Sequence, residues 1–67
     1  MVKATVNGEP RELPDGTTVA EVLLLMGRGP RGLAVAVNEE VVPRGKWSGT
    51  RLVDGDRVEI LAAAQGG

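Results

Sequence analysis

The sequence predicts an α+β domain in which a mixed sheet of four to five strands carries one helix on one face. Short segments of alternating apolar and polar residues occur in both halves of the chain, which is the period of half-buried strands. A single segment near residue 20 has apolar residues at helical spacing. With only 67 residues, the chain has room for one small core, so the helix must bury its apolar stripe against the sheet.

The first two strands are predicted to form a hairpin. Residues 2–6 alternate between apolar and polar side chains, and residues 9–13 form the returning strand. Asn7 and Gly8 between them both tolerate positive φ, which favours a tight two-residue turn. Because Pro10 has no backbone N–H to donate, the second strand is expected at an edge of the sheet.

The helix is expected directly after a turn at residues 14–16. Thr18 and Glu21 stand at the spacing of a capping box, and Thr17 is the alternative cap. Gly27 is a natural stop, which makes the helix about nine residues long. The apolar face of this helix consists of Val19, Val22, Leu23 and Met26.

The second half of the chain predicts three further extended segments. In chain order we expect a loop at 28–32, a strand at 33–37, a turn at 38–40, a short extended segment at 41–43, an irregular segment at 44–52, a turn at 54–56 and a final strand at 57–61. The final strand can lie centrally in the sheet only if it pairs in parallel with the first strand.

The composition argues against several classes of function. The net charge is −1, the eight basic residues are scattered, and Trp47 is the one aromatic residue, which disfavours nucleic-acid binding. The absence of Cys and His removes thiolate chemistry, the usual zinc sites and imidazole catalysis. No apolar segment approaches the length of about 20 residues that spans a membrane, and residues 1–6 lack a signal-peptide pattern. We therefore expect a cytoplasmic protein without a membrane partner.

The remaining chemically suggestive residues have plain structural interpretations. Trp47 is expected to fill the core rather than bind a ligand. Asp54 and Asp56 flank a glycine, which is more typical of a turn than of a metal site. Arg44 and Lys46 are expected to be solvated charges rather than a surface for an acidic partner. No metal site and no bound cofactor are predicted.

The end of the sequence differs in character from the rest. Residues 62–67 have no bulky side chain and end in Gly66 and Gly67, so the division expected is a globular domain at 1–61 and a flexible tail at 62–67. Six extended residues reach about 20 Å. Taken alone, such a tail is also compatible with a frayed terminus or a cloning remnant.

Several segments together have the order and spacing of one known family. They are Val6-Asn7-Gly8-Glu9, Thr18-Val19-Ala20-Glu21-Val22-Leu23, Val37-Asn38-Glu39-Glu40-Val41-Val42-Pro43-Arg44, Trp47, Leu52-Val53-Asp54-Gly55-Asp56 and Gly66-Gly67. On these segments the whole chain resembles the ThiS family, the sulfur carriers of thiazole formation in thiamine biosynthesis. Members of this family are ubiquitin-like proteins with the β-grasp fold.

The resemblance implies a carrier protein that is a substrate of its partners and not an enzyme. Gly67 is expected to be adenylated by an E1-like adenylyltransferase that uses ATP, and then to become a thiocarboxylate. Sulfur is expected from a donor such as a cysteine desulfurase and to pass to thiazole synthase. Gly66 and Gly67 form the tail motif, and the partner interface is expected at Leu61, Ala64 and Gln65.

Other functions remain open at this stage. A sister sulfur carrier, for molybdopterin synthesis or tRNA thiolation, shares the fold and the Gly-Gly ending. The pattern of Val42-Pro43-Arg44 with Trp47, and the short chain, favour the thiamine branch. A ubiquitin-like protein modifier and a plain β-grasp binding module, including one that contacts RNA, are the alternatives from other classes.

Overall fold

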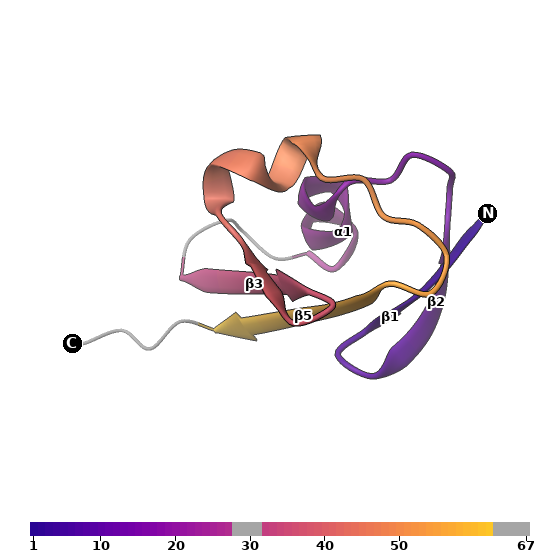
Figure 1. Cartoon of the computed structure of the whole chain (residues 1–67), viewed down its shortest axis with the longest axis horizontal. Helices are drawn as coiled ribbons and strands as arrows, with labels where there is room; N and C mark the ends of the chain where they lie inside the picture. The colour runs from indigo at the N-terminus through magenta and orange to yellow at the C-terminus, as the bar shows by residue number, and fades with distance from the viewer. Residues whose placement is uncertain (28–31, 63–67) are drawn as a thin grey trace.

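A computed structural model gives the fold and describes residues 1–27 and 32–62 (Figure 1). Most of the predicted loop at 28–32 lies outside the described residues, and so do Ala64, Gln65, Gly66 and Gly67. The elements in chain order are β1 (Val2–Val6), β2 (Glu9–Leu13), α1 (Val19–Leu25), β3 (Leu33–Val37), β4 (Glu40–Val42), the 3₁₀ helix η1 (Arg44–Gly49) and β5 (Arg57–Ala62).

The strands form one mixed five-stranded sheet in the order β2-β1-β5-β3-β4. β1 pairs with β5 in parallel, whereas the β1–β2, β3–β5 and β3–β4 pairs are antiparallel. The final strand is therefore central and pairs in parallel with the first, which meets the condition set out from the sequence. β2 lies at an edge, as Pro10 predicts. β5 ends at Ala62, one residue later than predicted, because Ala62 still pairs with Leu33.

The hairpin turn between β1 and β2 follows the predicted chemistry. Asn7 has φ 51° and Gly8 has φ 83°, so both central residues take the left-handed conformation of a type I′ turn. This turn matches the twist of the two strands and sets their register, in which Val6 faces Glu9 and Val2 faces Leu13. The alternation along β1 consequently directs Val2, Ala4 and Val6 into the core.

α1 begins with the predicted capping box. The Thr18 hydroxyl accepts a hydrogen bond from the Glu21 N–H at 3.2 Å, and the Glu21 carboxylate accepts one from the Thr18 N–H at 2.9 Å. Thr17 has a different role, because its hydroxyl donates to the Pro14 carbonyl at 2.6 Å. The helix spans seven residues, shorter than the roughly nine predicted, since Met26 already leaves the helical conformation.

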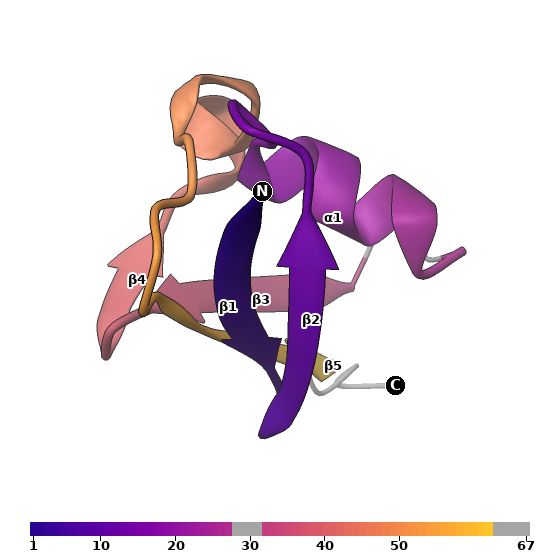
Figure 2. The same cartoon turned by 90° about the vertical axis from the view of Figure 1, so that its right-hand side faces the viewer.

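The core lies between α1 and one face of the sheet (Figure 2). β5 contributes Val58 and Ile60, and α1 contributes its buried face. The largest fully buried side chains, drawn from the sheet, from α1 and from the segment before β5, are Val6, Val19, Val22, Val35, Leu52 and Val58. All six are aliphatic, so burial of apolar surface is the main stabilising contribution.

The predicted irregular segment at 44–52 is wrong over its first six residues, which form η1. Trp47 anchors this 3₁₀ helix. Its side chain is 5% exposed in the core, and its Nε1 donates to the Val42 carbonyl at 2.8 Å. Trp47 is the buried residue of this segment, so the sequence shows no helical spacing of apolar residues. The prediction that Trp47 fills the core is confirmed.

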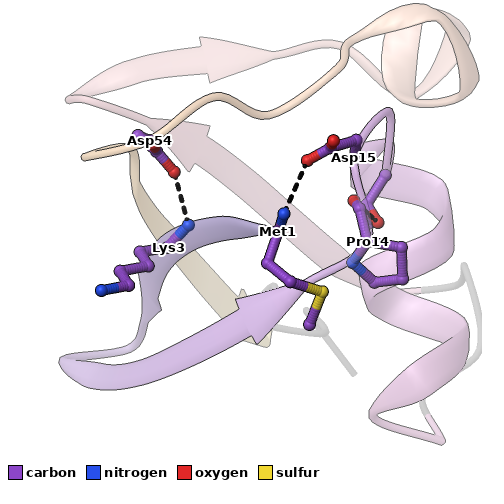
Figure 3. A network of polar contacts seen from close by, with 6 residues as sticks. Met1, Lys3, Pro14, Asp15 and Asp54 are labelled. Atoms are coloured by element: carbon purple, nitrogen blue, oxygen red, sulfur yellow. Dashed lines mark hydrogen bonds and ion pairs between the residues drawn. The ribbon is translucent and has the colours of Figure 1, made fainter.

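Two exposed polar contacts hold the N-terminal end of β1 (Figure 3). The Met1 amine lies 3.0 Å from Asp15 Oδ1 in the turn before α1. The Lys3 N–H donates to Asp54 Oδ1 at 2.7 Å in the turn before β5. β1 is thereby tied to both segments that lead into its packing partners.

Replacing Thr18 by Ala should lower the free energy of unfolding by about 1 kcal/mol, because the Glu21 N–H loses its acceptor. Thr18→Ser keeps the hydroxyl and is the matched control. Thermal unfolding followed by circular dichroism measures both variants, and about 1 kcal/mol corresponds to about 4–8 °C in a domain of this size. Equal melting temperatures for the two variants would contradict the role of the capping box.

The Met1 amine should titrate above its ordinary pKa. The hydrogen bond to Asp15 and then the charge of that carboxylate raise the pKa of the amine from 8.0. The resulting stabilisation is fully present below pH 8.0 and is lost as pH rises through the raised pKa. Asp15→Asn should lower the amine pKa, as measured by an NMR pH titration; an unchanged pKa would show that Asp15 is not its partner.

Candidate functional site

The candidate site is the end of β5, where the chain leaves the sheet. Of the residues predicted to carry function, Leu61 is the one within the described ranges; Ala64, Gln65, Gly66 and Gly67 lie outside them. β5 is the central strand and runs to Ala62, so the described part of the chain ends on the middle strand of the sheet (Figure 1). The site is therefore the place where a rigid element passes into the Gly-Gly segment.

Two asparagine side chains hold β5 from opposite sides. Asn38 Oδ1 accepts a hydrogen bond from the Arg57 N–H at 2.9 Å, and the Asn38 N–H donates to the Arg57 carbonyl at 2.8 Å. On the β1 side, Asn7 Oδ1 accepts from the Ile60 N–H at 2.8 Å. Both asparagines have positive φ in turns, where their side chains reach the neighbouring strand. β5 is thus fixed at its start and in its second half.

The turn before β5 is closed by carboxylates. Asp56 is 8% exposed, and its two oxygens accept from Asn38 Nδ2 and from the Val53 N–H, both at 2.9 Å. Asp54 accepts from the Lys3 N–H at 2.7 Å. These hydrogen bonds give both carboxylates the structural turn role predicted from the sequence, and they fix the direction in which β5 starts.

Leu61 points to the face of the sheet opposite α1. Its neighbour Ile60 is buried in the core, whereas Leu61 is 64% exposed, as alternation along a strand requires. Leu61 pairs with Ala34, and Val41 pairs with Ala36 on the next strand. These four apolar residues lie on one face and form what we call the outer-face patch: Ala34, Ala36, Val41 and Leu61.

Sequence reasoning found Leu61 but not the rest of the outer-face patch. Val41 is 76% exposed and lies in a segment whose register with β3 was not predictable from a three-residue apolar run. Ala34 and Ala36 lie in the predicted strand at 33–37, but the pairing of Ala34 with Leu61 depends on the antiparallel register of β3 with β5. Arg44 and Lys46 are exposed, as expected for solvated charges.

Five mixed strands with one α-helix on one face, and with the last strand central beside the first, define a small β-grasp protein. The model of the ThiS family matches residues 4–67. The chain therefore belongs to the ThiS family, and the resemblance drawn from the sequence is confirmed. Among the helices of the described residues, none has the length and apolar character needed to cross a membrane.

Individual relatives agree with this assignment. The chain is 47% identical over 62 residues to the sulfur carrier protein ThiS of Thermus thermophilus, covering 92% of this chain and 95% of that protein. The crystal structure of a thiamine biosynthesis protein (ThiS) from Geobacter metallireducens has a TM-score of 0.83 at 32% identity, covering 98% of this chain and 100% of that one. The family role of sulfur carrier in thiamine biosynthesis is thus shown.

A third relative is a larger protein. The thiazole synthase of Paramagnetospirillum magneticum is 36% identical over 66 residues, which are 98% of this chain but 20% of that enzyme. A segment similar to this chain is therefore part of a much longer polypeptide named for thiazole synthesis.

Side chains near the end of β5 alternate between the core and the outer face, so substitutions at neighbouring residues should differ in their effect on stability. Ile60→Ala should cost about 2–5 kcal/mol of unfolding free energy because it removes buried methyl groups. Leu61→Ala should change it by only about 0.5 kcal/mol because the side chain is mostly solvated. Chemical denaturation measures both variants, and a larger loss for Leu61→Ala would contradict the assigned orientation of the strand.

Proposed function

We propose that this chain carries sulfur as a thiocarboxylate on Gly67 and donates it to thiazole formation in thiamine biosynthesis. The observation that carries this proposal is the extent of the family match, which reaches residue 67 and so includes Gly66 and Gly67. β5, the central strand of the sheet, ends at Ala62, shortly before these residues in the sequence. In this proposal the partners bind the globular part, and the Gly-Gly end is the reactive group.

The chemistry requires activation by a partner. A carboxylate is a poor electrophile, so its oxygen first attacks the α-phosphate of ATP in an E1-like adenylyltransferase, and pyrophosphate leaves. The terminal sulfur of a persulfide on a donor such as a cysteine desulfurase then attacks the acyl carbon, and AMP leaves with the original oxygen. A thiol reductant cleaves the S–S bond of the resulting acyl disulfide and releases the thiocarboxylate, while the donor cysteine returns as a thiol. Glycine suits the attack on the acyl carbon because it has no Cβ to shield the carbonyl. In this scheme the chain is a substrate that binds no cofactor of its own, and ATP belongs to the partner.

Thiazole synthase is the proposed acceptor of the sulfur. The support is the thiazole synthase of Paramagnetospirillum magneticum, which holds a segment similar to nearly all of this chain. Two proteins that occur fused in one polypeptide are commonly proteins that must contact each other to carry out successive steps. These reactions use ATP and soluble enzymes, and we place them in the cytoplasm, with neither a membrane nor a nucleic acid as partner.

The outer-face patch is the proposed contact surface for these partners, together with Ala64 and Gln65. Its four residues are apolar, and Leu61 and Val41 are mostly exposed. Leu61 and Ala34 form the pair next to the end of β5, and Ala36 and Val41 lie further from it, beside Glu59. Exposed apolar groups of this kind on a small soluble domain are typical of binding surfaces. A partner that covers Leu61 is thereby placed next to the residues that follow Ala62.

Intact mass measures the proposed chemistry directly. After incubation with the adenylyltransferase, ATP and a sulfur donor, the mass of the full chain should rise by about 16 Da, since one oxygen of the activated acyl group is exchanged for sulfur. The chain without Gly67 should fold and show no rise. An active partner that leaves the mass of the full chain unchanged would contradict the proposal, and isopeptide-linked conjugates in cell extract would favour a protein modifier instead.

A further inference from the structure

β5 extends past the end of β1 (Figure 1). Their parallel pairing covers Thr5 with Arg57 and Val6 with Val58, after which the turn at Asn7 leads the chain away into β2. On its other side, β5 is accompanied by β3 to the last residue, where Leu33 faces Ala62. The final part of β5 therefore has one covered side and one side that no strand of the described residues occupies.

The backbone groups on that side can be identified by alternation. The carbonyls of Asp56 and Val58 accept from the Thr5 and Asn7 N–H groups at 3.0 and 2.8 Å, so even-numbered residues of β5 face β1. The Ile60 N–H faces the same way and is satisfied by Asn7 Oδ1 at 2.8 Å. The Ile60 carbonyl and the Ala62 N–H follow on this side.

The β1–β5 pairing ends at Val58, and within residues 1–27 and 32–62 no other donor or acceptor pairs with these two groups. We call them the open edge of β5. The odd-numbered residues serve the other side, since Arg57 exchanges its hydrogen bonds with Asn38 at the start of the β3 pairing. Ala62 pairs with Leu33 in the position of that ladder where backbone groups do not bond across, so the Ala62 N–H is not needed by the fold.

The open edge differs from the two outer edges of the sheet. Natural edges are commonly protected by proline, by charged side chains or by shortness. β2 carries Pro10 and charged residues on either side of it, and β4 has only three residues. At the open edge, Ile60, Leu61 and Ala62 offer no charge and no proline. An unprotected backbone edge is a template for another extended chain.

We propose that an extended segment of the thiazole synthase partner adds to the open edge of β5 as a short strand. This inference rests on the proposed function, in which the residues after Ala62 enter that enzyme. A strand added here lies alongside the last residues before the Gly-Gly segment, so main-chain hydrogen bonds fix the direction in which that segment enters the enzyme. Leu61 of the outer-face patch, 64% exposed, supplies an adjacent side-chain contact.

Asn7 sets the inner limit of this site. Its side chain occupies the place that a strand would take beside Ile60, because its Oδ1 accepts the Ile60 N–H. The added strand therefore pairs with the Ile60 carbonyl and the Ala62 N–H. The result is a short docking edge whose hydrogen bonds are independent of the side chains on the partner strand.

Removal of the Ala62 N–H tests the proposal. Ala62→Pro deletes this donor, and proline is compatible with the site because Leu61 before it is already extended. Ala62→Val keeps the donor and is the matched control. The dissociation constant for purified thiazole synthase, measured by calorimetry with the full chain, should rise about tenfold for Ala62→Pro and stay near the wild-type value for Ala62→Val.

A second variant distinguishes loss of the hydrogen bond of the Ala62 N–H from a change in the shape of residue 62. A synthetic chain with L-lactic acid in place of Ala62 replaces the N–H by an oxygen and keeps the size of the residue. Weak binding by both the proline and the lactic acid variants, with normal melting temperatures, supports strand addition. Normal binding by the lactic acid variant overturns it, whatever the proline variant does.

The behaviour of the wild-type chain separates this inference from the proposed function. If the wild-type chain binds thiazole synthase and all variants bind equally well, only the strand addition fails. If the wild-type chain does not bind thiazole synthase, the proposed partner fails and the strand addition fails with it. The mass measurement on Gly67 then decides whether the carrier chemistry itself still stands.

Discussion

The parallel pairing of β1 with β5 determines the arrangement of the rest of the domain. It joins the two ends of the chain, with Asn7 and Ile60 in contact across 53 residues, and it makes the last strand central. The pairing covers only two residue pairs, so side chains complete it: Asn7 extends it, and Asn38 and Asp56 close the start of β5. Closing so long a loop is entropically costly, and the burial of Val6, Val58 and their neighbours offsets it.

In this arrangement the two faces of β5 and its end have different roles. The residues facing α1, Val58 and Ile60, stabilise the fold, whereas Leu61 on the other face is mostly exposed. A functional group is presented reproducibly only when the element that carries it is held by its surroundings. Here that element is the central strand, which Asn38 holds at Arg57 and Asn7 holds at Ile60 before the chain continues to Gly67.

Features of the fold that depend on local chemistry were predictable from the sequence. The Asn7-Gly8 turn, the capping box of Thr18 and the edge position required by Pro10 each follow from one or two residues. Features that depend on tertiary contacts were not. η1 exists because Trp47 reaches the core and the Val42 carbonyl, and its sequence has no helical period. The partnership of Leu61 with Val41 in the outer-face patch required the register of β3, and the side-chain role of Asn7 required the point at which β1 ends.

The most direct test of the carrier function is a single-turnover sulfur transfer. The chain is first charged with isotopically labelled sulfur at Gly67 and freed of the activating enzymes and ATP. It is then mixed with thiazole synthase and the other thiazole precursors. The label should pass into the thiazole product in equal amount to the charged chain, and the chain should return to its uncharged mass. Thiazole that forms without the label, or equally well from a chain lacking Gly67, would contradict the assignment of this protein as the sulfur carrier.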